Sequence, residues 1–171
     1  MSKKSFILYI ILFVFSLFIA DSLINEFLEK GLNKYYGIGD DNEIALIGHS
    51  HLMLGLNKLQ LEESLKKGVS KYTREGVNVS DRLIMIKQLL NQNSKLKTII
   101  YGVDAWTFTG EGLSENSYKL FYPFLDEPTI DDYIYEKSDR LEYYTKKYLK
   151  SSRYNEQLIS GVKIYLYFMI T

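Results

Sequence analysis

The most strongly patterned part of the chain is its beginning. Lys3 and Lys4 precede an almost entirely apolar, uncharged run from Phe6 to Ala20, and apolar residues resume after Asp21. The run is hydrophobic on every face, which disfavours a buried core helix, and about 20 such residues can cross a bilayer. Residues 1–24 are therefore expected to form a transmembrane helix, with Asp21 at the interface.

A cleavable signal peptide would carry small residues at the third and first positions before the cut. Ala20 suits one of these positions, but Phe18 does not suit the other. An uncleaved signal anchor is therefore favoured. Because lysines that precede a span stay in the cytoplasm, we expect a single-pass protein of the cell membrane whose globular part is extracytoplasmic.

The anchor is followed by a stretch with the pattern of a stalk, residues 25–42. Its apolar residues keep helical spacing until Gly37 and Gly39 interrupt it. The folded domain is expected to start near Glu43 and to occupy residues 43–171.

Within this domain, short apolar runs alternate with amphipathic segments. The runs expected as strands are residues 43–48, 70–75 and 97–103, and the segments expected as helices are residues 57–68 and 79–93. Ser80 is a plausible cap for the second helix. Alternation of this kind is typical of α/β proteins, so we expect a three-layer, flavodoxin-like parallel sheet with helices on both faces.

The chain is less regular beyond the third strand. A long excursion, an insertion starting near residue 107, is expected to pass over the functional edge of the sheet. Thr129 and Asp132 resemble a capping box that opens a tyrosine-rich helix over residues 130–150. The apolar final segment, residues 154–171, is expected to be a helix or a strand.

Composition removes several classes of function. The 21 basic and 21 acidic side chains cancel, so nucleic acid is not an expected partner. The chain has no cysteine, which excludes a disulfide framework, a thiolate zinc site and a cysteine nucleophile within this sequence.

Chemistry in parallel sheets gathers at the carboxyl ends of the strands. The three expected strands deliver "GHSH", "EGVN" and "GVDAW" to that edge. In the first stretch, His49 and His51 lie two residues apart and could chelate one ion, with a carboxylate such as Asp104 completing the site. No third histidine exists, and no metal or other cofactor is expected.

The same stretches resemble the SGNH, or GDSL-like, hydrolase superfamily, in particular its membrane-anchored branch. Gly48-His49-Ser50-His51 resembles the first block, which makes Ser50 the nucleophile. "REGVNVSD" resembles the second block, with Gly76 as an oxyanion donor and Asn78 beside it. "YGVDAW" resembles the third block, in which Gly102 matches, Asp104 stands where an asparagine donor is expected, and Trp106 lies near the site.

The chain departs from the family in two groups that the reaction needs, an oxyanion donor and the general base. An ionised Asp104 accepts hydrogen bonds and would repel an oxyanion. The family's closing Asp-x-x-His block is absent, and neither His49 nor His51 is expected to aim its imidazole at the Ser50 hydroxyl. Structural alternatives also exist, because Ser50 could cap a helix, Gly76 could be a turn glycine and Asp104 could cap a turn.

The resemblance implies an anchored esterase or O-acyltransferase that acts on acyl esters of cell-envelope glycans. Its partners would be the membrane, an acylated polysaccharide and a membrane acyl-transfer protein. A doubly wound domain has about five strands, whereas three are recognisable here, so we expect a fragment with little activity. The competing hypothesis is a degenerate SGNH fold that binds an envelope component without turnover.

Overall fold

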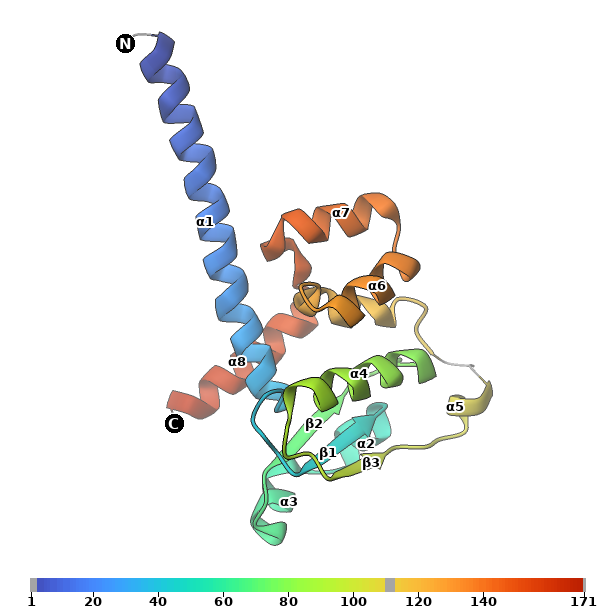
Figure 1. The fold of residues 1–171 in the computed structure, drawn as a ribbon. Helices are drawn as coiled ribbons and strands as arrows, with labels where there is room; N and C mark the ends of the chain where they lie inside the picture. The colour runs from blue at the N-terminus through green and yellow to red at the C-terminus, as the bar shows by residue number, and fades with distance from the viewer. Residues whose placement is uncertain (1–2, 110–112, 171) are drawn as a thin grey trace.

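Figure 1 shows the fold in a computed structural model, which describes residues 3–109 and 113–170. Its elements are α1 (Lys3–Tyr36), β1 (Ile44–Gly48), α2 (Ser50–Gly55), α3 (Lys58–Leu65), β2 (Val69–Thr73), α4 (Val79–Gln92), β3 (Thr98–Tyr101), α5 (Trp106–Thr109), η1 (Ser117–Phe124), α6 (Pro128–Lys137), α7 (Arg140–Tyr148), η2 (Lys150–Arg153) and α8 (Glu156–Ile170).

The three strands form a small, open parallel sheet in the order β2-β1-β3. The continuous apolar run of β1 takes the central place, where Ala45, Leu46 and Ile47 are fully buried. The register pairs Gly48 with Thr73, and Ile47 with Tyr101, so the three carboxyl ends lie at one edge. The α/β class and the parallel sheet that the alternating pattern predicts are confirmed.

The two faces of the sheet are covered unequally. On one face, Ala45 and Ile47 belong to the main hydrophobic core together with Met85 and Leu89 of α4, and α6 and η1 pack beyond that helix. On the other face, α2 and α3 contact β1 and β2. The helix α3 has no buried residue, so the second face carries much less apolar packing.

Local capping differs from the sequence expectation at the start of α4. The side chain of Asn78, not that of Ser80, caps this helix by accepting a 2.9 Å hydrogen bond from the backbone N–H of Asp81. In turn, the Asp81 carboxylate accepts a 2.8 Å hydrogen bond from the Asn78 backbone N–H, which completes a capping box. The expectation for Ser80 was wrong because α4 begins at Val79, so Ser80 already lies inside the helix and Asn78 holds the cap position.

The tyrosine-rich segment forms two helices rather than one. The expected capping box of Thr129 and Asp132 is wrong, because α6 begins with Pro128 at its first turn and has no side-chain cap. The chain leaves the helix at Ser138, and the Asp139 carboxylate then caps α7 by accepting from two backbone N–H groups. The Asp139 cap therefore divides the tyrosine-rich segment into the two helices α6 and α7.

The helix α1 continues past the expected span to Tyr36, directly before Gly37, where the sequence predicts that the helical spacing ends. Its last turns enter the domain, where Leu32 and Tyr36 are fully buried, and they pack against α8 (Figure 1). The contact is close, since a Cβ atom added to Gly31 would lie 2.6 Å from Cγ1 of Val162. The stretch expected as a stalk thus contributes its second half to the core.

Upstream of this junction, α1 projects away from the domain (Figure 1). It is the one helix among the described residues that is long and apolar enough to cross a membrane, with a mean hydropathy of 2.5 in its most apolar window. Its large apolar side chains are exposed as far as Phe27. The structure therefore provides a candidate membrane span at the position that the sequence predicts.

Candidate functional site

The turn after β1 places Ser50 and His49 at the carboxyl edge of the sheet. His49 has an extended backbone and precedes the first residue of α2, Ser50. The small residues Gly48 and Gly102 let α2 approach the sheet, because a Cβ atom on Gly48 would lie 3.2 Å from Leu52 Cδ2 and 3.4 Å from the Gly102 Cα. Both glycines therefore shape this turn.

The Ser50 hydroxyl is paired with the neighbouring imidazole. Its Oγ atom lies 2.7 Å from Nδ1 of His49, so the expectation that neither imidazole could be aimed at Ser50 was wrong. The other ring nitrogen of His49, Nε2, is buried and has no hydrogen-bond partner among the residues that the structure describes. His51 is exposed, and its ring centroid is 6.1 Å from that of His49.

Gly76 lies in a turn that only glycine fits well. Its φ is +72°, and an added Cβ atom would lie 2.6 Å from Cβ of Ser114. Its carbonyl accepts a 3.1 Å hydrogen bond from the Ser114 backbone N–H. The turn therefore joins the end of β2 to the segment that precedes η1.

Asp104 is held in a local network at the end of β3. Its carboxylate accepts from the backbone N–H and the hydroxyl of Thr107, both at 3.2 Å, and lies 3.7 Å from Nη2 of Arg82. The Arg82 guanidinium also donates to the Gly102 carbonyl at 2.7 Å. The bonds to Thr107 make the Asp104 carboxylate a cap of this turn. The nearby Arg82 guanidinium balances its negative charge.

Arg82 is a residue of this edge that sequence reasoning missed. It is fully buried on α4, and within the described part of the chain its Nε and Nη2 atoms have no hydrogen-bond partner. The available signal was helical spacing, because Arg82 precedes the buried Met85 and Leu89 by three and seven residues and so shares their face. Trp106, in contrast, starts α5 with 41% of its surface exposed.

Asn78 belongs to a different polar cluster. Its partner in the capping box, Asp81, is fully buried and also accepts hydrogen bonds from the hydroxyls of Ser117 and Tyr133, the latter at 2.6 Å. Burial and the bond to Asp81 raise the pKa of Tyr133. The Asn78 side chain is thus used to start α4.

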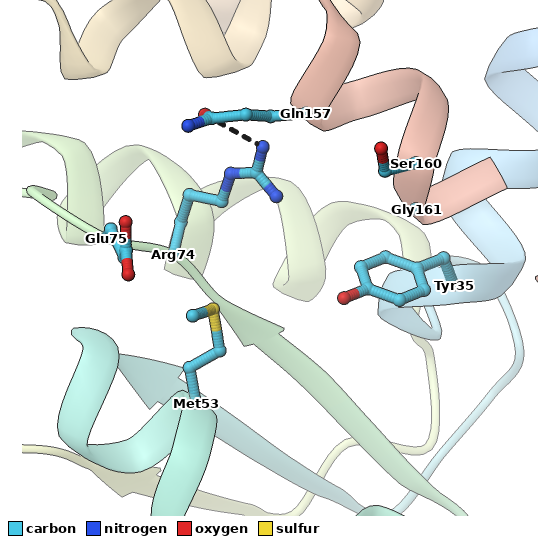
Figure 2. Close-up of a pocket in the computed structure, with 7 residues that line it drawn as sticks. All are labelled: Tyr35, Met53, Arg74, Glu75, Gln157, Ser160 and Gly161. Atoms are coloured by element: carbon cyan, nitrogen blue, oxygen red, sulfur yellow. Dashed lines mark hydrogen bonds between the residues drawn. The ribbon is translucent and has the colours of Figure 1, made fainter. Parts of the chain in front are cut away.

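A cavity of about 300 Å³ opens on the β2 side of the same edge. Figure 2 shows its lining, in which Arg74 donates a 3.2 Å hydrogen bond to Gln157 and Met53 approaches from α2. The seven lining residues are Tyr35, Met53, Arg74, Glu75, Gln157, Ser160 and Gly161. Met53 is one turn beyond His49, whose carbonyl accepts from its backbone N–H at 3.0 Å, so the cavity adjoins the Ser50 turn without including Ser50.

A larger cavity, of about 720 Å³, lies on the α3 side of β2 and shares Tyr35 and Met53 with the first. Lys71 lines it and donates through Nζ to the carbonyls of Met53 and Leu56. Burial lowers the pKa of this lysine. Lys71 therefore ties β2 to α2 beneath the Ser50 turn.

The structure thus separates the expected site residues into groups. Gly48, His49 and Ser50 form the turn after β1, and Gly102, at the end of β3, lies against it. Arg82 links Gly102 to Asp104, and Gly76 and Asn78 lie beyond β2. No cluster of three or more histidine, aspartate or glutamate side chains suited to a metal ion occurs in residues 3–109 and 113–170.

Searches of protein-family models, of curated proteins and of solved structures give no match to this chain.

Proposed function

We propose that this protein is a membrane-anchored serine esterase or O-acyltransferase of SGNH type, with Ser50 as nucleophile and His49 as its base. The observation that carries the proposal is the 2.7 Å approach of Ser50 Oγ to His49 Nδ1 at the carboxyl end of the central parallel strand. Activation of a serine hydroxyl requires a base within this distance.

The chemistry divides into two steps. With its proton on Nε2, His49 accepts the Ser50 proton at Nδ1 while Oγ attacks the acyl carbon, and the imidazolium then protonates the departing alkoxide. Water or a sugar hydroxyl next attacks the acyl-enzyme and loses its proton to the same nitrogen. The bond between the acyl carbon and Oγ then breaks, and the imidazolium returns the proton to Oγ of Ser50. The resemblance assigns the Gly76 N–H to the oxyanion, whereas Asp104 is already engaged by Thr107 and Arg82.

The anchor gives this proposal its setting. A span preceded by Lys3 and Lys4 would hold the domain on the extracytoplasmic side, next to the acyl esters of envelope glycans. An acylated polysaccharide would be the substrate, and a membrane acyl-transfer protein would be a partner if the reaction is a transfer. The complete three-layer SGNH arrangement is part of the proposal.

A non-catalytic envelope-binding protein is the second candidate. It is favoured by the structural use of two expected site residues, since Gly76 packs against Ser114 and Asp104 caps the turn at Thr107. A binder with the same fold would keep these turns and would not need the pairing of Ser50 with His49.

The first experiment measures hydrolysis of a chromogenic acetyl ester by the full chain in lipid nanodiscs. We expect slow but enzyme-dependent turnover. Ser50→Ala should reduce kcat/KM by roughly 10³-fold or more, to the background rate, because the acyl-enzyme can no longer form. His49→Ala should cause a comparable loss.

His51→Ala is the matched control. His51 is exposed, whereas the imidazole paired with the Ser50 hydroxyl is that of His49, so this variant should change turnover little. If both histidine variants are inactive, a chelator abolishes activity and Ser50→Ala remains active, a metal site replaces the nucleophile. If the wild type has no turnover above Ser50→Ala, the binding hypothesis replaces the enzyme.

A further inference from the structure

The helix α7 carries an exposed apolar and aromatic stripe. Leu141, Tyr144 and Tyr148 recur at helical spacing and are 78%, 47% and 70% exposed, and Leu149 extends the stripe. The rings of Tyr144 and Tyr148 are stacked. On the opposite face, the buried Tyr143 donates a 2.7 Å hydrogen bond to Asp131 of α6. The helix is therefore fixed to the domain and presents one apolar face outward.

The end of α7 is tied directly to the candidate membrane span. The next element, η2, donates the backbone N–H groups of Lys150 and Ser151 to the Asp21 carboxylate of α1, both at 2.8 Å. One turn along α1, Asn25 accepts a 3.1 Å bond from the Tyr154 hydroxyl. In Figure 1, α7 lies on the side of the domain toward the N-terminal half of α1 and runs across that helix rather than alongside it.

The level of the membrane follows from the exposed residues of α1. Its apolar side chains stay exposed beyond Asp21, at Leu23, Ile24 and Phe27. Asp21 is six residues upstream of Phe27, roughly 9 Å along the helix axis. Lipid that covers Phe27 therefore also reaches the level of Asp21, where η2 and the end of α7 are attached.

The charge and residue types around the stripe suit the headgroup layer. Tyrosine is enriched at this level of a bilayer, and lysine and arginine stems extend their charges to it. Over residues 135–153, basic side chains outnumber acidic ones, although the whole chain is neutral. The basic residues are Lys137, Arg140, Lys146, Lys147, Lys150 and Arg153, against Glu136, Asp139 and Glu142. Lys147 is paired with Asp131, and Lys150 and the buried Arg153 are paired with Asp126. Lys137 and Arg140 are exposed.

We propose that α7 is a second membrane contact, which lies in the headgroup layer of the same bilayer that holds α1. Its apolar stripe inserts at the level of the acyl boundary, and the exposed Arg140 of α7 and Lys137 just before it contact anionic headgroups, as in interfacial amphipathic helices. Two contacts prevent the domain from pivoting on the anchor. The inference rests on the anchoring part of the proposed function and is independent of the chemistry at Ser50.

Because the chain contains no cysteine, single nitroxide labels can measure depth in the full chain. Leu141→Cys and Tyr148→Cys report on α7, and Val14→Cys reports on the span. Leu59→Cys on α3 is the matched control, since it replaces another exposed helical leucine, 61% exposed, outside the proposed contact. The measurement is the ratio of collisions with oxygen to collisions with a water-soluble nickel complex, in phosphatidylcholine and phosphatidylglycerol nanodiscs.

We expect ratios at Leu141 and Tyr148 that are severalfold above that at Leu59 and below that at Val14. Equal ratios at Leu141 and Leu59, with Val14 in lipid, would overturn the α7 contact and leave the anchor intact. A water-like ratio at Val14 would overturn both. If lowering the number of chains per nanodisc to one lowered the ratios on α7, a second copy would be the occupant and the proposal would be wrong.

Discussion

Two polar clusters near the carboxyl edge of the sheet are built in opposite ways. Around Asp81, the carboxylate accepts from the Asn78 backbone N–H, the Ser117 hydroxyl and the Tyr133 hydroxyl, which ties α4 to η1 and α6. Around Ser50, one short pairing links two adjacent residues, and the buried Nε2 of His49 has no hydrogen-bond partner in residues 3–109 and 113–170.

The difference distinguishes structural from functional use of polar groups. A buried donor or acceptor without a partner costs about 1–3 kcal/mol, so a fully bonded cluster contributes to folding and an unbonded one does not. The Asp81 cluster is therefore expected to matter for stability and little for chemistry directly. The Ser50 turn is expected to show the reverse.

The largest effect on stability is expected at Asp81. Asp81→Ala removes the helix cap and leaves the buried Tyr133 hydroxyl without its acceptor, so the free energy of unfolding should fall by about 3 kcal/mol or more. Urea unfolding of the full chain in detergent micelles, followed by tyrosine circular dichroism, measures it. Asp81→Asn is the control and should lose less, because an amide oxygen still accepts. Wild-type stability of the alanine variant would show that the cluster does not support the fold.

An intermediate effect is expected at Gly76. Gly76→Ala places a side chain at a φ of +72° and 2.6 Å from Ser114, and the left-handed backbone alone costs about 1–2 kcal/mol. Gly55→Ala is the matched control, since nothing lies within 4 Å of its added Cβ atom and alanine favours the helix by up to about 1 kcal/mol. Thermal unfolding should order the variants as Gly55→Ala, wild type, Gly76→Ala. A Gly76→Ala protein as stable as Gly55→Ala would contradict the tight turn.

The smallest effect on stability is expected at His49. His49→Gln removes an imidazole whose Nε2 makes no hydrogen bond, so the free energy of unfolding should change by less than about 1 kcal/mol. The same unfolding measurement, with His51→Gln as control, tests this. A loss as large as that of Asp81→Ala would make His49 a structural residue and would remove the contrast between the two clusters.

Much of the fold could be read from local pattern. The run at residues 43–48 predicted β1 within one residue, and the alternation around it predicted a parallel sheet. The apolar run after Lys4 predicted the exposed part of α1. Capping was less predictable, because Asn78 and Ser80 compete two residues apart and Pro128 starts α6 before Thr129 can cap it. Such choices differ by about 1 kcal/mol, so packing decides them.

The sequence by itself determined which stretches become strands, helices and a candidate span, because hydrophobic periodicity and burial act on neighbouring residues. It also placed Ser50 after the first strand. Only the tertiary structure decided which polar groups meet. The approach of Nδ1 to the Ser50 hydroxyl depends on the side-chain orientation within one turn. Arg82 reaches Asp104 across 22 positions of chain, and Asp21 meets η2 at a separation of 130 residues. Contacts at such separations depend on how the helices pack, and no local pattern in the sequence records that packing.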